Sequence, residues 1–220
     1  SSYSARVQAS NADLVERRLA ATVQGFGLEP AEVRWERLGL LFELWQRFGR
    51  AFNLSASLDE SGLLGHVLEG LQVVTLARRI GWQAGEPWID VGSGAGFPGL
   101  VVAACLEGPV TLVEPRERRA SFLDMAVHQI GRADCRVVRG HVDERGWRAL
   151  RRGDEVALGS FGWASARAVF SPEEWVAVGS RLVRAGGTVV VHVRPESPEM
   201  AGTVARVDGE KWSIRGVRVG

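Results

Sequence analysis

The sequence has 220 residues, of which 45% are hydrophobic and 24% are charged. This balance is ordinary for a globular protein and excludes a disordered chain, a collagen-like chain and a disulfide scaffold. The 27 basic and 26 acidic residues give a formal net charge of +1. A nucleic-acid partner would therefore have to bind a local basic patch, because the chain as a whole has almost no net charge. The length predicts one large domain, or one domain with an appendage.

The cysteines and the lack of long apolar runs indicate where the chain works. Cys105 and Cys135 are 30 residues apart and match no metal-binding or redox spacing, so we expect two buried free thiols and no metal. No run of 18 apolar residues is present, and residues 1–10 lack the apolar segment of a secretory signal. The sequence therefore predicts a cytoplasmic protein with no membrane span, and we expect a monomer.

The first 80 residues carry apolar positions at helical spacing. Asn11 or Asp13 is a candidate cap for the first helix, and Pro30 is suited to the first turn of the second. The third helix is expected to start near Asp59 or Ser61 and to end at Gly81. Helices are thus predicted over about 11–25, 30–48 and 59–81.

From residue 88 onward, short β-like runs alternate with helical segments. This alternation predicts an α/β fold, Rossmann-like, with a mostly parallel sheet and helices on both faces. The division is expected near residue 82, between an N-terminal helical region (1–82) packed on the core and a cofactor-binding domain (83–220). Strands are predicted at 88–91, 110–113, 135–138, 161–168 and 188–193, helices at 97–106, 116–130, 143–151 and 172–183, and a closing hairpin at 204–219.

The most informative segment is the glycine-rich loop after the first strand, which reads IDVGSGAGFPG over residues 89–99. Gly94, Gly96 and Gly99 satisfy the GxGxxG pattern, and Glu114 follows 20 residues after Gly94, as in a dinucleotide site. However, Asp90 stands two residues before the first glycine, where a dinucleotide fingerprint usually has aliphatic residues. The acidic-x-Gly-x-Gly-x-Gly order resembles motif I of class I S-adenosylmethionine methyltransferases.

The neighbouring carboxylates suit that cofactor, which carries an amino acid, a sulfonium and a nucleoside but no pyrophosphate. Asp90 would favour its positive charges, and Glu114, at the end of the second strand, would accept from both ribose hydroxyls. Asp143, with the backbone at Val142, would meet the adenine amino group. The other candidate cofactor-binding residues lie in the loop: Gly92, Ser93, Gly94, Gly96 and Phe97.

Three segments together resemble one family, the 16S ribosomal RNA guanine-N7 methyltransferases called RsmG or GidB. The head has Trp45, then FNLS at 52–55 and HVLE at 66–69, and the loop ends in the specific Pro98-Gly99 pair. The third segment runs from LVE at 112–114 through Arg118-Arg119 and Phe122-Leu123 to VRG at 138–140 and Asp143-Glu144, and ARA at 166–168 then stands where the family has SRA. Several acceptor-side positions differ. Gly65, Glu69, Gly70 and Ala166 stand where the family has Arg, Asp, Ser and Ser, and Val193 replaces a Lys.

The resemblance implies a class I methyltransferase that binds S-adenosylmethionine and methylates guanine N7 in 16S rRNA of the 30S subunit. This ring nitrogen already has a free lone pair, so direct in-line transfer needs no general base, and positioning supplies much of the rate. Three alternatives remain: a diverged enzyme acting on a small molecule or another RNA, a non-catalytic S-adenosylmethionine-binding or RNA-binding module and, more remotely, an NAD dehydrogenase.

Arg167 and His66 are the candidate catalytic residues. Arg167 would fork to guanine O6 or to a phosphate, and the alternative is a structural arginine paired with a carboxylate. His66 would stack on or bond to the base, or else is a satisfied core histidine. Asn53 either holds the loop or caps a helix, and Phe97 either lines the methionine pocket or belongs to the core. A basic run, either an RNA-binding patch or a solvated face, comprises Arg116, Arg118, Arg119, Arg132, Arg136 and Arg139.

Overall fold

The structure is a computed structural model that describes residues 2–49, 51–52 and 59–220. The N-terminal third is helical, as predicted, and consists of α1 (Ser2–Gly25), the 3-10 turn η1 (Pro30–Glu32), α2 (Trp35–Phe48) and α3 (Glu60–Ile80). The expected ends of α3 are confirmed, since the Asp59 side chain accepts from the Gly62 amide at 2.9 Å and Gly81 closes the helix with φ of 95°.

Two helix starts differ from the prediction. The first helix already begins at Ser2, so Asn11 and Asp13 lie inside it and do not cap it. Residues 2–24 contain neither glycine nor proline, so nothing in the backbone interrupts the helix before Asn11. Pro30 begins only the short turn η1, and α2 starts five residues later at Trp35, whose indole donates to the Pro30 carbonyl at 2.9 Å.

The rest of the chain forms a seven-stranded sheet in the order β3-β2-β1-β6-β7-β9-β8. The five strands from β3 to β7 are parallel, and β9 and β8 add an antiparallel hairpin at one edge. The strands are β1 (Trp88–Val91), β2 (Val110–Val113), β3 (Arg136–Val138), β6 (Phe161–Ala166), β7 (Val183–Val193), β8 (Thr203–Asp208) and β9 (Ser213–Arg218).

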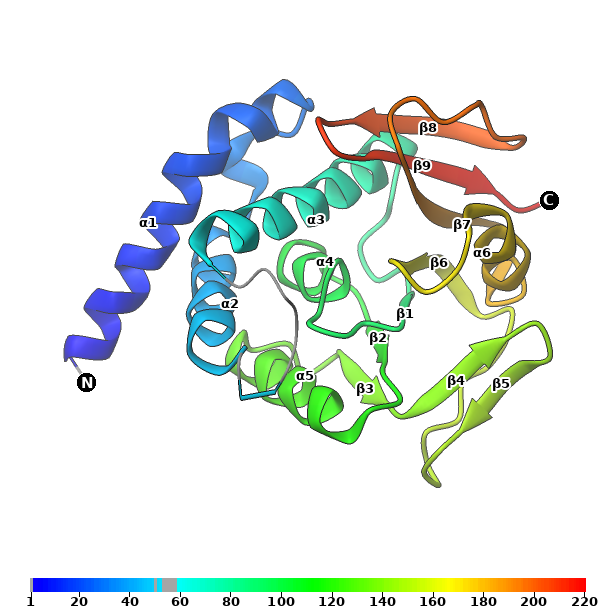
Figure 1. The fold of residues 1–220 in the computed structure, drawn as a ribbon, viewed down its shortest axis with the longest axis horizontal. Helices are drawn as coiled ribbons and strands as arrows, with labels where there is room; N and C mark the ends of the chain where they lie inside the picture. The colour runs from blue at the N-terminus through cyan, green and yellow to red at the C-terminus, as the bar shows by residue number, and fades with distance from the viewer. Residues whose placement is uncertain (1, 50, 53–58) are drawn as a thin grey trace.

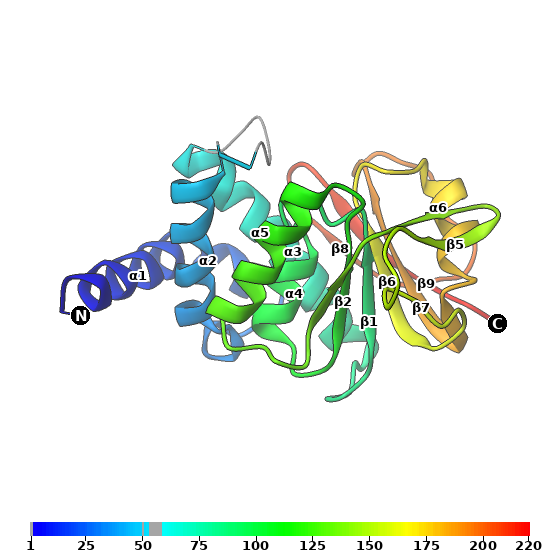
Figure 2. The ribbon, with the colours of Figure 1, turned by 90° about the horizontal axis from the view of Figure 1, so that it is seen from below.

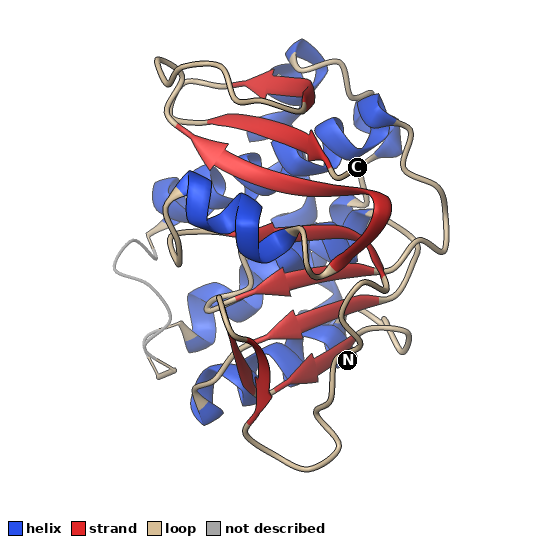
Figure 3. Ribbon diagram, turned by 90° about the vertical axis from the view of Figure 1, so that its right-hand side faces the viewer, coloured by secondary structure: helices blue, strands red, loops and turns tan. Residues whose placement is uncertain are grey.

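Helices cover both faces of this sheet, which confirms the predicted α/β architecture. The connecting helices α4 (Gly99–Cys105) and α5 (Glu117–Gln129) lie on the same face as α3, while α6 (Pro172–Gly179) lies on the other (Figure 2). Figure 3 shows α6 in front of the sheet and the remaining helices behind it. The chain leaves β1 toward β2 and leaves β6 toward β7, so the strand order reverses between β1 and β6. A crevice at such a switch point is the usual ligand site of open parallel sheets.

The predicted helix over 143–151 is wrong, because this segment is a hairpin of β4 (Gly140–Asp143) and β5 (Gly146–Ala149). Asp143 turns the chain by accepting from the Arg145 amide at 2.8 Å, and Gly146 takes a φ of 120° that side chains disfavour. Trp147 then packs on Gly140, where a Cβ would lie 2.2 Å from the ring. Local turn chemistry therefore outweighs the helical composition.

The helical region and the sheet share an apolar core. One buried cluster runs from Val15 in α1 through Trp45 and Leu71 to Leu112 and Ile214. Helix α3 lies between α1 and the β8–β9 hairpin and connects the two parts (Figure 1). The division at residue 82 stays a prediction. None of the helices in the described parts of the chain is long and apolar enough to cross a membrane.

Candidate functional site

The glycine-rich loop leaves β1 at the switch point and is anchored on both sides. The Ser93 amide donates to the Val113 carbonyl of β2 at 2.9 Å, which ties the loop to the sheet. On the helical side, the fully buried Trp45 donates from its indole to the Ala95 carbonyl at 2.8 Å. Trp45 therefore fixes the loop in addition to packing in the core. A rigid loop of this kind holds backbone amides in place for a ligand.

The loop glycines have separate physical roles. Gly96 has a φ of 95°, and a Cβ there would lie 2.3 Å from Leu100, so this glycine permits close packing of α4. Gly94 has a φ of 56°, but its nearest neighbours lie 3.7 and 3.9 Å from the Cβ position. Gly94 is therefore required by its backbone conformation rather than by crowding, and it lines the cavity, where the lack of a side chain lets a ligand approach the backbone closely.

Asp90 lies beneath the loop and does not line the cavity beside it. Its Oδ1 accepts from the Ser165 hydroxyl at 2.7 Å, and that hydroxyl accepts from the Trp88 indole at 2.9 Å. Complete burial raises the pKa of Asp90 to about 6, although hydrogen bonds from Ser165 and Ser93 oppose the shift. The structure thus places Asp90 as a buried support that joins β1 to β6.

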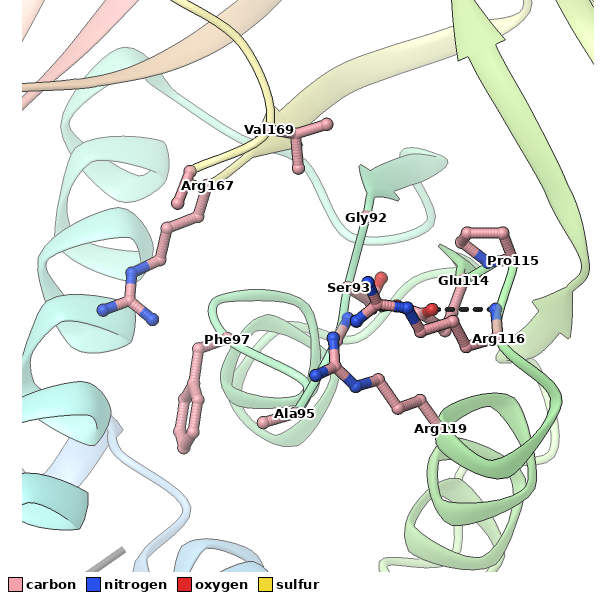
Figure 4. A pocket seen from close by; sticks show the side chains of 12 residues that line it. Gly92, Ser93, Ala95, Phe97, Glu114, Pro115, Arg116, Arg119, Arg167 and Val169 are labelled. Atoms are coloured by element: carbon pink, nitrogen blue, oxygen red, sulfur yellow. Dashed lines mark hydrogen bonds between the residues drawn. The ribbon is translucent and has the colours of Figure 1, made fainter. Parts of the chain in front are cut away.

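Glu114, directly after β2, contacts the glycine loop and lines the first cavity, which has a volume of about 530 Å³. Its Oε2 accepts from the Gly94 amide and its Oε1 from the Arg116 amide, both at 2.9 Å. The carboxylate is therefore fixed in direction while it still lines the cavity (Figure 4). Each carboxylate oxygen has two lone pairs, so both retain capacity to accept from a ligand.

The first cavity includes most of the loop residues that the sequence singled out. Gly92, Ser93, Gly94 and Phe97 line it, together with Arg116, Arg119 and Val169, which sequence reasoning did not assign to the cofactor. Arg116 and Arg119, at the start of α5, point back toward the loop in Figure 4. The sequence could have indicated a role in this cavity, because both arginines follow closely after Glu114 at the carboxyl end of β2.

Two predicted cofactor residues lie elsewhere. Val142 is a buried residue of β4, and Asp143 lines a different cavity of about 390 Å³ beside Phe170 and Glu174. The hairpin that replaces the expected helix carries both residues away from the first cavity. The predicted adenine contact of Asp143 stays a prediction.

Arg167 follows directly after β6, and its side chain points toward α3 (Figure 4). Its Nε lies 2.8 Å from Oε1 of Glu69, and its Nη2 lies 3.0 Å from Nδ1 of His66. His192, on β7, approaches the same Glu69 oxygen with its Nε2 at 3.5 Å. Arg167 is therefore paired with a carboxylate, as the structural interpretation of this arginine predicted. It also contacts His66, so the two candidate catalytic residues lie in one cluster.

Burial sets the protonation of this cluster. Desolvation, together with the Arg167 charge, lowers the pKa of His66 to about 4 and that of His192 to about 3. Desolvation raises the pKa of Glu69, while Arg167 opposes that shift. His66 is thus neutral at pH 7 and accepts from Arg167 through Nδ1, which leaves its proton on Nε2.

A second cavity of about 480 Å³ adjoins the first. Arg167 lines both cavities, and Phe97 of the first packs on His66 of the second with ring centroids 4.9 Å apart. Phe97 also packs on Trp45 at 4.3 Å. The lining of the second cavity comes from α1, α3 and the β8–β9 turn and includes Gly65, His66, Glu69, Gln72, Lys211 and Trp212.

The basic run does not form one surface. Arg132 is 2% exposed and donates to the carbonyls of Ala103, Leu106 and Gly108 and to the Asp134 carboxylate. It is therefore a structural residue that closes the ends of α4 and α5. Both cysteines are buried free thiols, as predicted.

The predictions for Asn53 fall outside the described residues. Among the residues that the structure describes, no group of three or more His, Cys, Asp or Glu side chains is arranged to hold a metal ion.

The comparisons with known proteins agree on one family and one fold. The family model GidB, described as rRNA small subunit methyltransferase G, matches residues 34–203. A relative named ribosomal RNA small subunit methyltransferase G, from Neisseria meningitidis serogroup B, is 33% identical over 129 residues, which are 58% of this chain and 60% of the relative. The chain thus matches about 60% of the length of the first such relatives.

A relative of the same name from Ralstonia nicotianae is 28% identical over 218 residues, which cover 94% of this chain and 90% of the relative. Among solved structures, a mutant of the protein named MtNAS in complex with S-adenosylmethionine has a TM-score of 0.52 and 15% identity, and it covers 86% of this chain and 77% of its own. At this identity the likeness concerns the fold alone.

Proposed function

Because this chain belongs to the family of rRNA small subunit methyltransferase G proteins, we propose that it transfers a methyl group from S-adenosylmethionine to guanine N7 in 16S ribosomal RNA. The observation that carries the proposal is the Glu114 carboxylate, which is fixed by the amides of Gly94 and Arg116 and lines the cavity at the switch point of the sheet. A cavity of this size and place suits a nucleoside cofactor.

The residues present fit S-adenosylmethionine. Glu114 offers a buried carboxylate to a pair of ribose hydroxyls, and charge-assisted hydrogen bonds of this kind are stronger than neutral ones. The amides and small side chains of residues 92–95 let the methionine part lie against the backbone. Phe97 gives an apolar surface at the side nearest His66. When bound, S-adenosylmethionine supplies a methyl group on a sulfonium that a ring nitrogen with a free lone pair attacks directly.

The residues of the chain would contribute by positioning, since no proton has to be removed from guanine N7. Trp45 and Val113 hold the glycine loop in place, and Phe97 and Arg167 lie on the boundary between the two cavities. Arg167, fixed by Glu69 and His66, brings a positive charge to the side from which a base or a phosphate approaches. Asp90 acts from below, by joining β1 to β6 through Ser165.

The proposal also includes the binding partner, the oligomeric state and the cellular location of the protein. The substrate would be 16S rRNA within the 30S subunit, met by a monomer in the cytoplasm. The helical region 1–82 would act with the domain 83–220, because α3 supplies His66 and Glu69 to the same site as Arg167.

Methyl transfer from labelled S-adenosylmethionine to 30S subunits tests the proposal. Subunits from cells that lack this modification serve as substrate, and modified subunits serve as control. We expect label in guanine N7 of the unmodified subunits alone. Cofactor binding by calorimetry without label in these subunits would contradict the rRNA activity. Label in a small molecule or another RNA would then indicate a diverged enzyme, and absence of all transfer a binding module.

A further inference from the structure

We propose that the second cavity receives the acceptor base, and that Arg167 and Glu69 select guanine by its O6, N1 and N2 groups. This inference rests on the proposed function, because it concerns the acceptor of the same methyl transfer. Its starting point is the position of the cavity. Arg167 lines both cavities, and the Phe97–His66 contact is a second link between them, so a base in the second cavity lies beside a cofactor in the first.

The order of charges in the second cavity matches the order of groups around guanine. Around the base, the N7 and O6 acceptors are followed by the N1–H and N2–H₂ donors. Along the protein, the first cavity is followed by the Arg167 guanidinium and then by the Glu69 carboxylate, 2.8 Å away. If Arg167 donates to O6 and the Glu69 carboxylate accepts from both N1–H and N2–H₂, then N7 faces the first cavity. Recognition and direction of transfer are therefore set by the same pair.

The same pair rejects adenine, whose N7 is equally able to accept a methyl group. Adenine presents an amino group where guanine has O6, and this donor would face the Arg167 donors. Its unprotonated N1 would face the Glu69 carboxylate, so two lone pairs would oppose each other. A site with buried polar groups disfavours a base that leaves them unpaired.

The polar groups of this cavity are buried. Arg167 Nε and Glu69 Oε1 are 2.8 Å apart and form an ion pair, so each has the other as its partner. Glu69 is only 5% exposed, and His66 Nε2 is buried without a hydrogen-bond partner among the described residues. Buried polar groups are normally satisfied, so His66 Nε2 indicates a ligand that accepts its proton in a hydrogen bond at this wall of the cavity.

The β8–β9 turn supplies the other wall. Gln72 of α3 donates to the Trp212 carbonyl at 3.2 Å and to the Val207 carbonyl at 3.4 Å, which holds the turn against α3. Trp212 lines the cavity with a partly exposed ring, a surface on which a base can stack, and the exposed Lys211 lies at the same wall. Both residues lie beyond residue 203, where the match to the family model ends.

Free nucleotides test this inference without the ribosomal substrate. Binding of guanosine, inosine and adenosine 5′-monophosphate is measured by ligand-observed NMR with S-adenosylhomocysteine present. Inosine lacks only the N2 amino group, so we expect it to bind at least about tenfold more weakly than guanosine, and adenosine not to bind in the millimolar range. Lys211 is the only lysine of the sequence. Its acetylation, followed by mass spectrometry, should be slowed by guanosine 5′-monophosphate and not by adenosine 5′-monophosphate.

Variants at Glu69 distinguish a role in guanine recognition from a purely structural role as the partner of Arg167. Glu69→Gln keeps the size but replaces an acceptor by a donor, so we expect the guanosine-to-inosine ratio to fall to about one, with S-adenosylmethionine binding retained. Glu69→Asp keeps the carboxylate and should keep the preference. If Glu69→Gln fails to fold, Trp212→Ala replaces it and should weaken guanosine binding several-fold. An unchanged ratio in folded Glu69→Gln, unprotected Lys211, or no guanosine binding in the millimolar range would each overturn the inference. Failure of the proposed function would instead appear as absence of label in 30S subunits.

Discussion

Arg167, directly after β6, and Glu69 on α3 form an ion pair, with 2.8 Å between Nε and Oε1, at the boundary between the two cavities. Glu69 is buried, so its charge depends on this one close guanidinium and on the weaker field of Lys211. The pair therefore connects the helical region to the sheet at the place where the two reactants are proposed to meet. Stability and activity should both respond to its removal, but in different ways.

Arg167→Met tests this connection. The variant leaves the buried Glu69 charge without its partner, so we expect the free energy of unfolding to fall by about 3 kcal/mol, as for other broken buried ion pairs. Urea unfolding at pH 7 measures the change. The double variant Arg167→Met, Glu69→Met removes both charges and should recover most of the stability while methyl transfer stays lost. A double variant no more stable than Arg167→Met would show that the unpaired charge is not the cause.

Glu114→Gln should weaken cofactor binding far more than it weakens the fold. The amide keeps the shape of the side chain but turns one acceptor, now bonded to the Gly94 or Arg116 amide, into a donor. With the charge-assisted bonds to the ribose lost as well, we expect S-adenosylmethionine affinity to fall about 10- to 100-fold. Calorimetry measures the affinity, and the exposed Glu117→Gln, three residues away, is the matched control. Equal affinities for these two variants would contradict the proposed role of Glu114.

The sequence predicted the parts of the site that depend on local pattern. A glycine loop between a strand and a helix, followed by an acidic residue at the end of the next strand, can be recognised from residues that are close in the sequence. The structure brings Gly94 of this loop into contact with Glu114. The pairing of Arg167 with Glu69 joins residues 98 positions apart, and no local pattern specifies it. Lys211 and Trp212 enter the second cavity only because Gln72 holds the β8–β9 turn against α3.

The fold, like the site, was predicted correctly where local sequence pattern determines the structure. The alternation of short apolar runs and helical segments was sufficient for the parallel strands and for α5, since each has the period of its element. Residues 143–151 were misassigned because their charged composition suits a helix, whereas the turn at Asp143 and Gly146 and the packing of Trp147 on Gly140 decide the structure. Tertiary contacts of this kind are not visible in a single segment.

Two glycines of α3 should respond oppositely to alanine. Gly65 is exposed, and a Cβ there meets nothing within 4 Å, so Gly65→Ala should raise the free energy of unfolding by about 0.5–1 kcal/mol through helix propensity. A Cβ at Gly70 would lie 2.6 Å from Val101 of α4, so Gly70→Ala should lower it by about 1–3 kcal/mol through overpacking. Urea unfolding of both variants is the measurement, and shifts of the same sign would contradict the packing of α3 on α4.

Gly65→Arg restores the cation that the family has at this position, at the lining of the second cavity. Since the site is open, the side chain should be accommodated without loss of stability. An added positive charge near the cavity should strengthen binding of 30S subunits, and the gain should shrink at high salt. Filter binding at two salt concentrations, with Gly65→Ala as the uncharged control, measures the effect. Equal affinities for the Arg and Ala variants would exclude an RNA contact at residue 65.

The buried Asp90 should give the protein a distinct pH dependence of stability. Burial raises its pKa from 3.8 to about 6 in the folded state, so the folded protein holds this proton more tightly than the unfolded chain does. Protonation of Asp90 therefore stabilises the folded state. This contribution to the free energy of unfolding is fully present below the unfolded pKa of 3.8 and is lost as pH rises through 6. The shift of about two pKa units corresponds to about 3 kcal/mol.

Asp90→Asn removes this titration while it keeps the shape of the side chain beside Ser165. The free energy of unfolding is measured in urea from pH 4 to pH 7 for both proteins. Since Glu69, His66 and His192 titrate in both, the difference between the two curves isolates Asp90. We expect wild type to lose about 2.4 kcal/mol relative to Asp90→Asn across this range, because the unfolded chain is already more than half ionised at Asp90 at pH 4. A constant difference would mean that Asp90 is already ionised at pH 4 in the folded state, and that Ser165 and the loop stabilise the charge more than burial opposes it.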